Sequence, residues 1–405
     1  MTKKLRIINS SNAIWSQSGY AMQAVQFVPK MAEAGYPTAM VNFYGQEGGD
    51  FMYKSVKMYP KMNSTWGEDA ALHHGLDFKA DVIITLQDIW TLNPQILADM
   101  SRRGLRWIPI IPIDHEPIPP ATYNRLKLAY RIIAMSKFGY DELKKVGMHS
   151  TYIPHTIETD LYKPMTSEEK KIVRQKAKLP EDAFLFGMVA ANKDNPPRKS
   201  FQEVLDAFKI FLDKHKNTYI YFHTIHNQQG GFPILEYAKF IGVDSHVITC
   251  DPNDYLYRIK HTDMPKIYNS FDCLLAPSRN EGFGVPIIEA QSCGIPVITT
   301  NFTAQKTLVK DGETGYLVNI SYKHYSPLGA YVGIPCVEDL YKKMELVYNA
   351  DRVKMGVKAR EHVINNYDFN LVWKNKWLPF LDKLEKEIYI WQELDIYIII
   401  KLCKV

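Results

Sequence analysis

Two glutamates flank a glycine-rich segment in the second half of the chain. Glu281 and Glu289 stand eight residues apart, and residues 282–284 read Gly-Phe-Gly. The glycines let the backbone approach a ligand closely and leave amide N–H groups free to donate hydrogen bonds. Pro286 suits the first turn of a helix, whose N-terminus carries the partial positive charge that favours phosphate. Carboxylates there accept hydrogen bonds from sugar hydroxyls, so we expect the segment to bind a nucleotide sugar. The alternative is a tight strand-to-helix turn with Glu289 solvated.

The residues around these glutamates resemble a known family. Pro-Ser at 277–278 precedes Glu281, seven residues separate it from the second glutamate, and Gly-Ile-Pro-Val-Ile follows at 294–298. This pattern is similar to the E-x7-E motif and its flanks in the retaining glycosyltransferases of family four (glycosyl transferase group 1), which have the GT-B fold. Residues 263–278 resemble the family's approach to the motif, and residues 131–164 resemble the end of its first domain.

The resemblance implies a role for each residue of the motif. Glu289 would bind the donor ribose, and Glu281 would bind the transferred sugar. The backbone of Gly282, Phe283 and Gly284 would contact sugar and phosphate. Further along the chain, the 301–318 segment departs from the family pattern, which puts nucleotide contacts from that loop in doubt.

The family also has a pair of basic residues after the first strand of its second domain. Lys199 matches the family lysine. A Pro-Pro insertion shifts the spacing, so Lys193 and Arg198 are alternatives for the second cation. Fixed cations are needed here because a leaving nucleoside diphosphate gains negative charge as the glycosidic bond breaks. A solvated loop charge is the alternative for each residue.

In the first half, residues 11–24 fall where the family has the loop between its first strand and first helix. Ser18 and Gly19 match the small residues that let this loop approach the donor phosphates or the acceptor. Tyr20 and Trp15 are candidates to line the acceptor site, and packing is the alternative for both.

Residues 112–120 end another strand next to a proline-rich loop. Asp114 and His115 are polar residues at this strand terminus, which is a suitable position for a ligand contact. Family members often have a histidine near here that touches the transferred sugar. We therefore select His115, with a structural role as the alternative.

Short apolar runs alternate with helical patterns along most of the chain, which predicts parallel sheets covered by helices on both faces. The expected strands lie within 5–10, 38–45, 80–87, 106–114, 130–136, 150–155, 183–190, 217–225, 246–250, 271–278, 295–300 and 315–319. We expect an α/β protein of two Rossmann-like, doubly wound domains facing a cleft, the GT-B arrangement by resemblance. Ligands of such sheets bind beyond the carboxyl ends of the strands.

The charged, proline-bounded segment 166–182 divides the two series of strands. We expect an N-terminal domain at 1–165, a nucleotide-sugar-binding domain at 183–365, and a linker helix at 166–182. The helical run 366–394 is expected to cross back to the first domain. The apolar tail 395–405 is too short to span a membrane; docking on the body or weak contact with a membrane surface are its two interpretations.

Composition places broad limits on function. The 405 residues carry a net charge of +5, with 46% hydrophobic and 23% charged residues, which is ordinary for a globular protein and too mild for a dedicated nucleic-acid binder. The five cysteines are scattered and form no Cys-x-x-Cys pair, which favours a reducing cytoplasm. His223 and His226 lack the spacing of a helical zinc pair, and we expect no metal or other cofactor. His155, matched by a family histidine, is expected to support the hinge.

These observations together predict a retaining glycosyltransferase that needs no metal. By resemblance, the acceptor attacks from the same face that the phosphate leaves, and the phosphate accepts the acceptor's proton. The donor is expected to be UDP- or GDP-linked; the acceptor stays open among a glycan, a lipid-linked sugar, a protein and a modified nucleobase. The alternatives are an epimerase or phosphorylase of the same fold, or a non-catalytic sugar- or nucleic-acid-binding relative.

Overall fold

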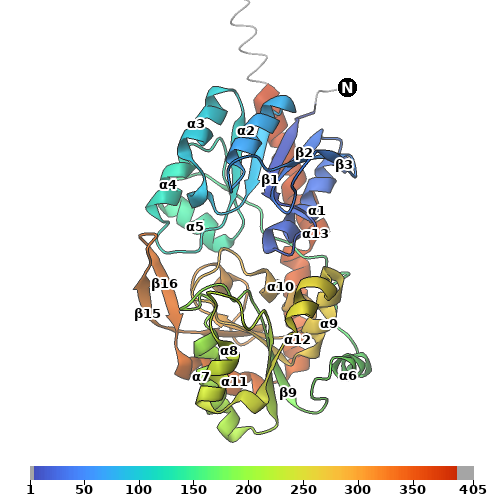
Figure 1. Cartoon of the computed structure of the whole chain (residues 1–405), viewed down its shortest axis with the longest axis vertical. Helices are drawn as coiled ribbons and strands as arrows, with labels where there is room; N and C mark the ends of the chain where they lie inside the picture. The colour runs from blue at the N-terminus through green and yellow to red at the C-terminus, as the bar shows by residue number, and fades with distance from the viewer. Residues whose placement is uncertain (1–3, 390–405) are drawn as a thin grey trace, which may run out of the picture.

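The apolar runs form two separate sheets of parallel strands, stacked along the long axis of the molecule (Figure 1). The computed structural model describes residues 4–389. Helices cover both sheets, and the cleft-side loops of one domain face those of the other. The tail 395–405, and the last five residues of the predicted helical run 366–394, lie outside the described residues.

The first sheet has the strand order β3-β4-β2-β1-β5-β6-β7-β8, with β3 alone running antiparallel to its neighbour within this described sheet. Its central strands β1 and β5 are almost fully buried, as expected for a sheet covered on both faces. Its elements are β1 (Ile7–Asn12), α1 (Gly19–Glu33), β2 (Thr38–Tyr44), β3 (Phe51–Tyr53), β4 (Val56–Pro60), α2 (Glu68–Asp77), β5 (Val82–Leu86), η1 (Ile89–Thr91), α3 (Pro94–Arg102), β6 (Arg106–Ile111), α4 (Pro120–Leu126), β7 (Ile133–Ala134), α5 (Lys137–Lys145) and β8 (Thr151–Tyr152).

The second sheet is parallel in every pairing described, in the order β11-β10-β9-β12-β13-β14. Gly187 in β9 is needed for packing, because a Cβ there would lie 2.2 Å from the ring of Phe271. The elements that follow in the chain, through the second crossing, are α6 (Ser167–Lys176), β9 (Phe184–Val189), α7 (Phe201–Lys214), β10 (Thr218–His223), α8 (Ile234–Ile241), η2 (Asp244–His246), β11 (Val247–Thr249), η3 (Asp254–Arg258), η4 (His261–Asp263), α9 (Met264–Ser270), β12 (Cys273–Ala276), α10 (Val285–Ser292), β13 (Val297–Thr300), η5 (Ala304–Thr307), β14 (Gly315–Val318), β15 (Ile320–Tyr325), β16 (Tyr331–Pro335), α11 (Val337–Asn349), α12 (Arg352–Tyr367), α13 (Phe369–Val372) and η6 (Trp373–Trp377).

The sequence pattern did not indicate the two antiparallel pairings, β3–β4 and β15–β16. The tight turn between β3 and β4 uses Lys54 and Ser55, both at positive φ (43° and 64°). Such turns normally carry Asn or Gly, so this one has no sequence signal. The β15–β16 hairpin is exposed along β15 and therefore lacks a clear apolar alternation.

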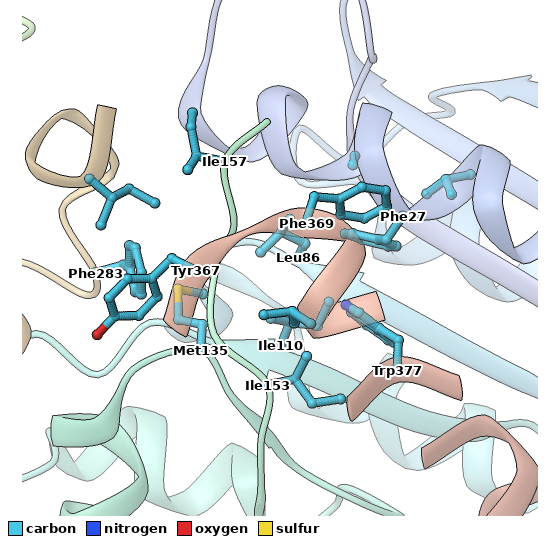
Figure 2. Packing of buried hydrophobic residues seen from close by; sticks show 14 of the residues in the cluster. Phe27, Leu86, Ile110, Met135, Ile153, Ile157, Phe283, Tyr367, Phe369 and Trp377 are labelled. Atoms are coloured by element: carbon cyan, nitrogen blue, oxygen red, sulfur yellow. The ribbon is translucent and has the colours of Figure 1, made fainter. Parts of the chain in front are cut away.

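The chain crosses between the domains twice, and the two crossings pair with each other. The Ile157 N–H donates to the Tyr367 carbonyl at 2.9 Å, and the Phe369 N–H donates back to the Ile157 carbonyl at 3.0 Å. Figure 2 shows these residues within a continuous apolar cluster that joins Phe283 of the second domain to Trp377. The connection between the domains is therefore a paired, apolar-packed joint.

After the second crossing, the chain packs on the first domain. The Trp377 ring stacks on Phe27 of α1 at 4.9 Å between centroids, and residues 378–389 continue as helix. Tyr36 donates a hydrogen bond to Asp382 at 3.1 Å, and the Leu5 N–H donates to Glu385 at 3.2 Å.

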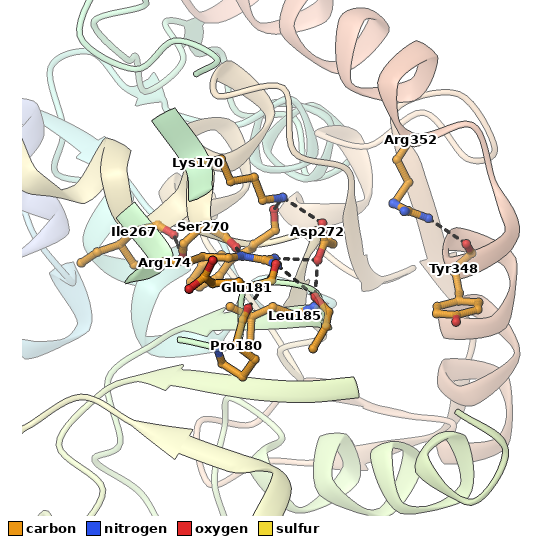
Figure 3. A network of polar contacts seen from close by, with 12 residues as sticks. Lys170, Arg174, Pro180, Glu181, Leu185, Ile267, Ser270, Asp272, Tyr348 and Arg352 are labelled. Carbon is orange, nitrogen blue, oxygen red and sulfur yellow. Dashed lines mark hydrogen bonds and ion pairs between the residues drawn. The ribbon is translucent and has the colours of Figure 1, made fainter. Parts of the chain in front are cut away.

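The segment expected to be a linker is attached to the second domain instead. Helix α6 carries Arg174, whose guanidinium donates to Asp272 at 2.7 Å and to the carbonyls of Ser270 and Ala183, both at 2.9 Å (Figure 3). Lys170 donates to the other Asp272 oxygen at 2.8 Å. A charged helix appears linker-like in the sequence because the buried partners of its cations lie about a hundred residues away.

Replacing Arg174 with Ala should strongly destabilise the second domain. The change removes the guanidinium from Asp272, which keeps Lys170 and the Leu185 N–H, and it leaves several buried carbonyls without this donor; removing one partner of a buried ion pair costs about 3–5 kcal/mol. We expect a large fall in the urea midpoint. Arg103→Ala is the control, because Arg103 forms an exposed pair with Asp99, which is worth about 1 kcal/mol or less. Equal midpoints for the two variants would contradict the proposed anchoring.

Candidate active site

Glu281 lies at the centre of a charged cluster where β9, β12 and α10 meet. Lys199 donates to its Oε1, and Arg198 Nη1 lies 3.4 Å from its Oε2. Arg198 also donates to the Asn280 carbonyl at 2.6 Å. The side chains of Glu281 and Lys199 are only 14% and 18% exposed, so these charges interact in surroundings that little water reaches.

The electrostatic balance keeps Glu281 ionised. Burial by itself raises the pKa of this carboxyl, but the charges of Lys199 and Arg198 outweigh it and lower the pKa to about 2. The carboxylate is therefore available as an acceptor for hydroxyl groups at any ordinary pH. The two cations, for their part, are placed to face an anionic ligand.

A neighbouring loop fixes the backbone of Glu281. The Glu281 N–H donates to Thr303 Oγ1 at 3.0 Å, and the Ala304 N–H donates to the Glu281 carbonyl at 3.3 Å. Thr303 is fully buried and has φ at 48°, an unusual conformation for a β-branched residue. Sequence reasoning noted this loop only for its departure from the family pattern and missed its supporting role.

A small cavity of about 20 Å³ opens beside this cluster. The cavity is lined by Lys199 and Glu281, by Gly284 and Pro286 at the N-terminus of α10, and by the ends of β9 and β12. Helix α10 begins here, and its free N–H groups and dipole favour an anion. The cavity is far smaller than the roughly 300–1,000 Å³ typical of ligand pockets, so a ligand of that size fits only if the surrounding groups move apart.

Glu289 is not among the residues that line this cavity. Its side chain is 7% exposed and accepts a hydrogen bond from the Tyr268 hydroxyl at 2.5 Å. Burial raises the pKa of this carboxyl, whereas hydrogen bonds from Tyr268 and Tyr162 lower it; the net direction is upward. The ribose contact expected for Glu289 stays a prediction, and in this structure the carboxylate contacts tyrosines.

Gly282 and Phe283 contact the first domain. A Cβ on Gly282 would lie 2.5 Å from the Cβ of Pro112, so glycine is required for the domains to approach. The Phe283 ring is 4% exposed and lies 5.2 Å from the ring of His155. His155 is 6% exposed, and its burial lowers its pKa to about 3. From the sequence, the backbone of these two motif residues is expected to contact the ligand. In the structure, Gly282 lets Pro112 approach and the Phe283 ring packs beside His155, so both residues contribute to the joint between the domains.

Asp114 and His115 lie on the opposite side of the same joint. His115 Nδ1 is 2.6 Å from Asp114 Oδ1, and Asn280 Nδ2 donates to Asp114 Oδ2 at 2.9 Å. Asp114 and Asn280 therefore connect the predicted His115 to the Glu281 cluster. Sequence reasoning missed Asn280, because nothing in its local pattern indicates a contact with a residue 166 positions away.

Of the two alternatives for the second cation, Arg198 reaches Glu281, whereas Lys193 is exposed on the preceding loop. Ser18 caps α1: its Oγ accepts from the Ala21 N–H at 3.1 Å. Gly19 is the first residue of this helix and is exposed.

Within residues 4–389, no group of three or more His, Cys, Asp or Glu side chains is arranged to hold a metal ion. His223 lies instead against Tyr255, with ring centroids 5.1 Å apart. Also among the described residues, no helix combines the length and apolar character needed to cross a membrane.

Comparison with known proteins identifies the segment that builds this cluster. Residues 169–324, from α6 to β15, match the family described as glycosyl transferases group 1. This segment belongs to the glycosyl transferases group 1. The group 1 segment contains Lys199, Arg198 and the whole E-x7-E motif.

A curated relative extends the likeness to half of the chain. The capsular polysaccharide biosynthesis glycosyltransferase CapM of Staphylococcus aureus is 28% identical over 211 residues, which cover 51% of this chain. The match spans about half the length of that relative, 48%.

Solved structures show the fold of both domains. Sucrose-phosphate synthase from Thermosynechococcus elongatus superposes with a TM-score of 0.74 at 15% identity and covers 94% of this chain and 99% of its own. The Anabaena protein HepE, solved in complex with UDP and glucose, has a TM-score of 0.69 at 14% identity and covers 93% and 99%. The fold is GT-B, as the sequence predicted.

Sequence reasoning also missed Asp88. The ionisation of this residue should make the stability of the folded protein depend on pH. Burial and the neighbouring Asp114 charge raise its pKa from 3.8 to about 6, against the lowering effects of Tyr20, Arg198 and His115. The folded state thus disfavours ionised Asp88. This cost is absent below about pH 4, develops as the pH rises to about 6, and is complete above that.

Asp88→Asn should therefore gain stability relative to the natural protein as the pH rises from 4 to 7, by about 2 kcal/mol. Urea unfolding at a series of pH values measures the difference. Asp99→Asn, at a carboxylate on α3 that pairs with Arg103, is the control for loss of a charge in the same domain. A pH-independent difference for Asp88→Asn would mean that this carboxyl titrates normally.

Proposed function

We propose that this chain is a glycosyltransferase that moves a sugar from a nucleotide-diphosphate donor to an acceptor hydroxyl. The observation that carries the proposal is the ionised Glu281 held by Lys199 and Arg198 at the N-terminus of α10. Cations and helix amides suit the diphosphate, and the carboxylate suits the sugar hydroxyls. The group 1 match of this same segment supports the assignment.

In this proposal, Lys199 and Arg198 stabilise the charge that develops on the leaving diphosphate. Glu281 orients the transferred sugar and offsets the positive charge that develops at its anomeric carbon. His115, held by Asp114, approaches the sugar from the first domain. We infer that no metal is needed, since these cations and the helix terminus perform the same electrostatic role.

Several finer points belong to the proposal. A uridine diphosphate donor is favoured by HepE, which was solved with UDP and with UDP-glucose. Retention at the anomeric carbon is inferred from the resemblance to family four, and NMR of the product anomer tests it. We also propose a cytoplasmic location, with peripheral contact with a membrane as the alternative; the cysteines that the structure describes are free thiols, as in a reducing compartment.

A ligand screen in a buffer containing EDTA tests the proposal. At least one UDP- or GDP-linked sugar should raise the melting temperature, because a ligand that binds only the folded state stabilises it. The same compound should be hydrolysed slowly without an acceptor and without added metal. If no nucleotide sugar binds, the proposed function is wrong. If magnesium or manganese is required for turnover, the role given to the two cations is wrong.

Glu281→Gln should lower kcat by about 10²–10³-fold, the effect of losing one electrostatic stabiliser of a transition state. The donor KM should change less, because glutamine keeps the shape and part of the hydrogen bonding. Glu313→Gln is the matched control, since Glu313 is a 57% exposed carboxylate of the same domain. Turnover by well-folded Glu281→Gln at the rate of the control would remove this residue from the site.

A further inference from the structure

Asp88 and Tyr20 form a polar pair at the cleft-facing edge of the first sheet. Asp88 directly follows the end of β5, and Tyr20 lies in the first turn of α1. The Tyr20 hydroxyl donates to Asp88 Oδ1 at 3.2 Å. Strands β5 and β6 are neighbours, so their carboxyl ends place Asp88 beside the segment that carries Asp114.

Asp88 is poorly compensated compared with the other carboxylates of the cleft. Glu281 has Lys199 and Arg198, and Asp114 has His115 and Asn280. Within residues 4–389, the one side-chain hydrogen bond to the Asp88 carboxylate comes from Tyr20. The residue is nevertheless partly exposed. A half-buried carboxylate with free acceptor capacity is costly unless a ligand donates to it.

Asn280 gives an independent indication of a ligand at this place. The residue is 2% exposed, and its amide nitrogen donates to Asp114. Its carbonyl oxygen Oδ1 is buried and has no hydrogen-bond partner. Buried amide oxygens are normally satisfied. Two incompletely satisfied acceptors, Asp88 and Asn280, thus both interact with Asp114.

Exposed tryptophans lie on loops at the same edge of the first sheet. Trp15 follows β1, Trp66 follows β4 and Trp90 follows β5, with exposed fractions of 48%, 43% and 43%. Flat aromatic faces cover the apolar C–H faces of sugar rings, and ligand sites commonly combine such surfaces with a few polar groups. An ammonium ligand is disfavoured, because Arg198 and His115 both act electrostatically on Asp88.

We propose that Asp88, with Tyr20, binds the acceptor, and that the acceptor is a carbohydrate with neighbouring free hydroxyls. The inference rests on the proposed function and names its second substrate. One acceptor hydroxyl donates to Asp88, and an adjacent oxygen attacks the anomeric carbon of the sugar held at Glu281. The bond from that carbon to the diphosphate oxygen breaks, its electron pair stays on the diphosphate, and the acceptor's proton passes to the same leaving group.

The test uses the nucleotide sugar found in the screen above, with p-nitrophenyl glycosides of glucose, galactose, mannose and N-acetylglucosamine as acceptors. 4-Nitrobenzyl alcohol is the non-sugar acceptor. At least one glycoside should be glycosylated, and the alcohol should not. Asp88→Asn should raise the acceptor KM at least tenfold, Tyr20→Phe should raise it severalfold, and both should keep the donor KM within twofold. Asp99→Asn is the control for a carboxylate of the same domain.

Each other outcome overturns the inference. A purely structural Asp88 would give the variant an altered melting temperature with the acceptor KM of the control. Nucleotide-sugar binding and hydrolysis without transfer to any glycoside would exclude the carbohydrate class while leaving the proposed function intact. Glycosylation of 4-nitrobenzyl alcohol as fast as of the glycosides would likewise exclude the carbohydrate class and leave the proposed function intact. Absence of any nucleotide-sugar binding would instead refute the proposed function, and the acceptor site with it.

Discussion

The ionised carboxylate of Glu281 is the constraint on which the cleft depends. A charge this poorly hydrated is tolerated only with close partners, so Lys199 and Arg198 must both turn toward it from the loop after β9. Thr303, which itself has an unusual backbone conformation, accepts a hydrogen bond from the Glu281 N–H and so holds the Glu281 backbone. Helix α10 then starts directly beyond it, which places amide groups and cations around one cavity.

This cluster lies against the first domain, so the site and the joint between the domains share residues. Asn280 donates to Asp114, and Gly282 packs on Pro112, on either side of Glu281. The β15–β16 hairpin adds a second contact, where Glu116 pairs with Tyr331 through two backbone hydrogen bonds of 2.9 and 3.2 Å. Because the cavity is small, entry of the proposed nucleotide sugar would require these contacts to separate. The paired crossings near Ile157 are suited to act as the hinge.

The two sides of the cleft have different chemistry. The second domain presents the cations Lys199 and Arg198, whereas the first presents the carboxylates Asp88 and Asp114. A diphosphate is attracted to the former and repelled by the latter, which would orient the proposed nucleotide sugar with its sugar toward the first domain. Hydroxyl-rich ligands suit the remaining acceptors. The charges of the two domains thus match the roles that we propose: the cations of the second domain bind the donor, and the carboxylates of the first domain bind the acceptor.

The local sequence determined the parallel sheets and the donor-side motif. Apolar runs of strand length predicted the strands of both sheets except β3, β4 and the hairpin, and Glu281 and Lys199 were identified from spacing and resemblance. Contacts between distant segments were decided only by the tertiary structure. It selected Arg198 over Lys193, placed Glu289 against Tyr268, and gave Gly282 a packing role. It also revealed Asn280, Thr303 and Asp88, whose importance comes from partners 22 to 166 positions away. Periodicity reports which face of an element is buried, but the identity of the partner across a cleft depends on how two folded domains meet.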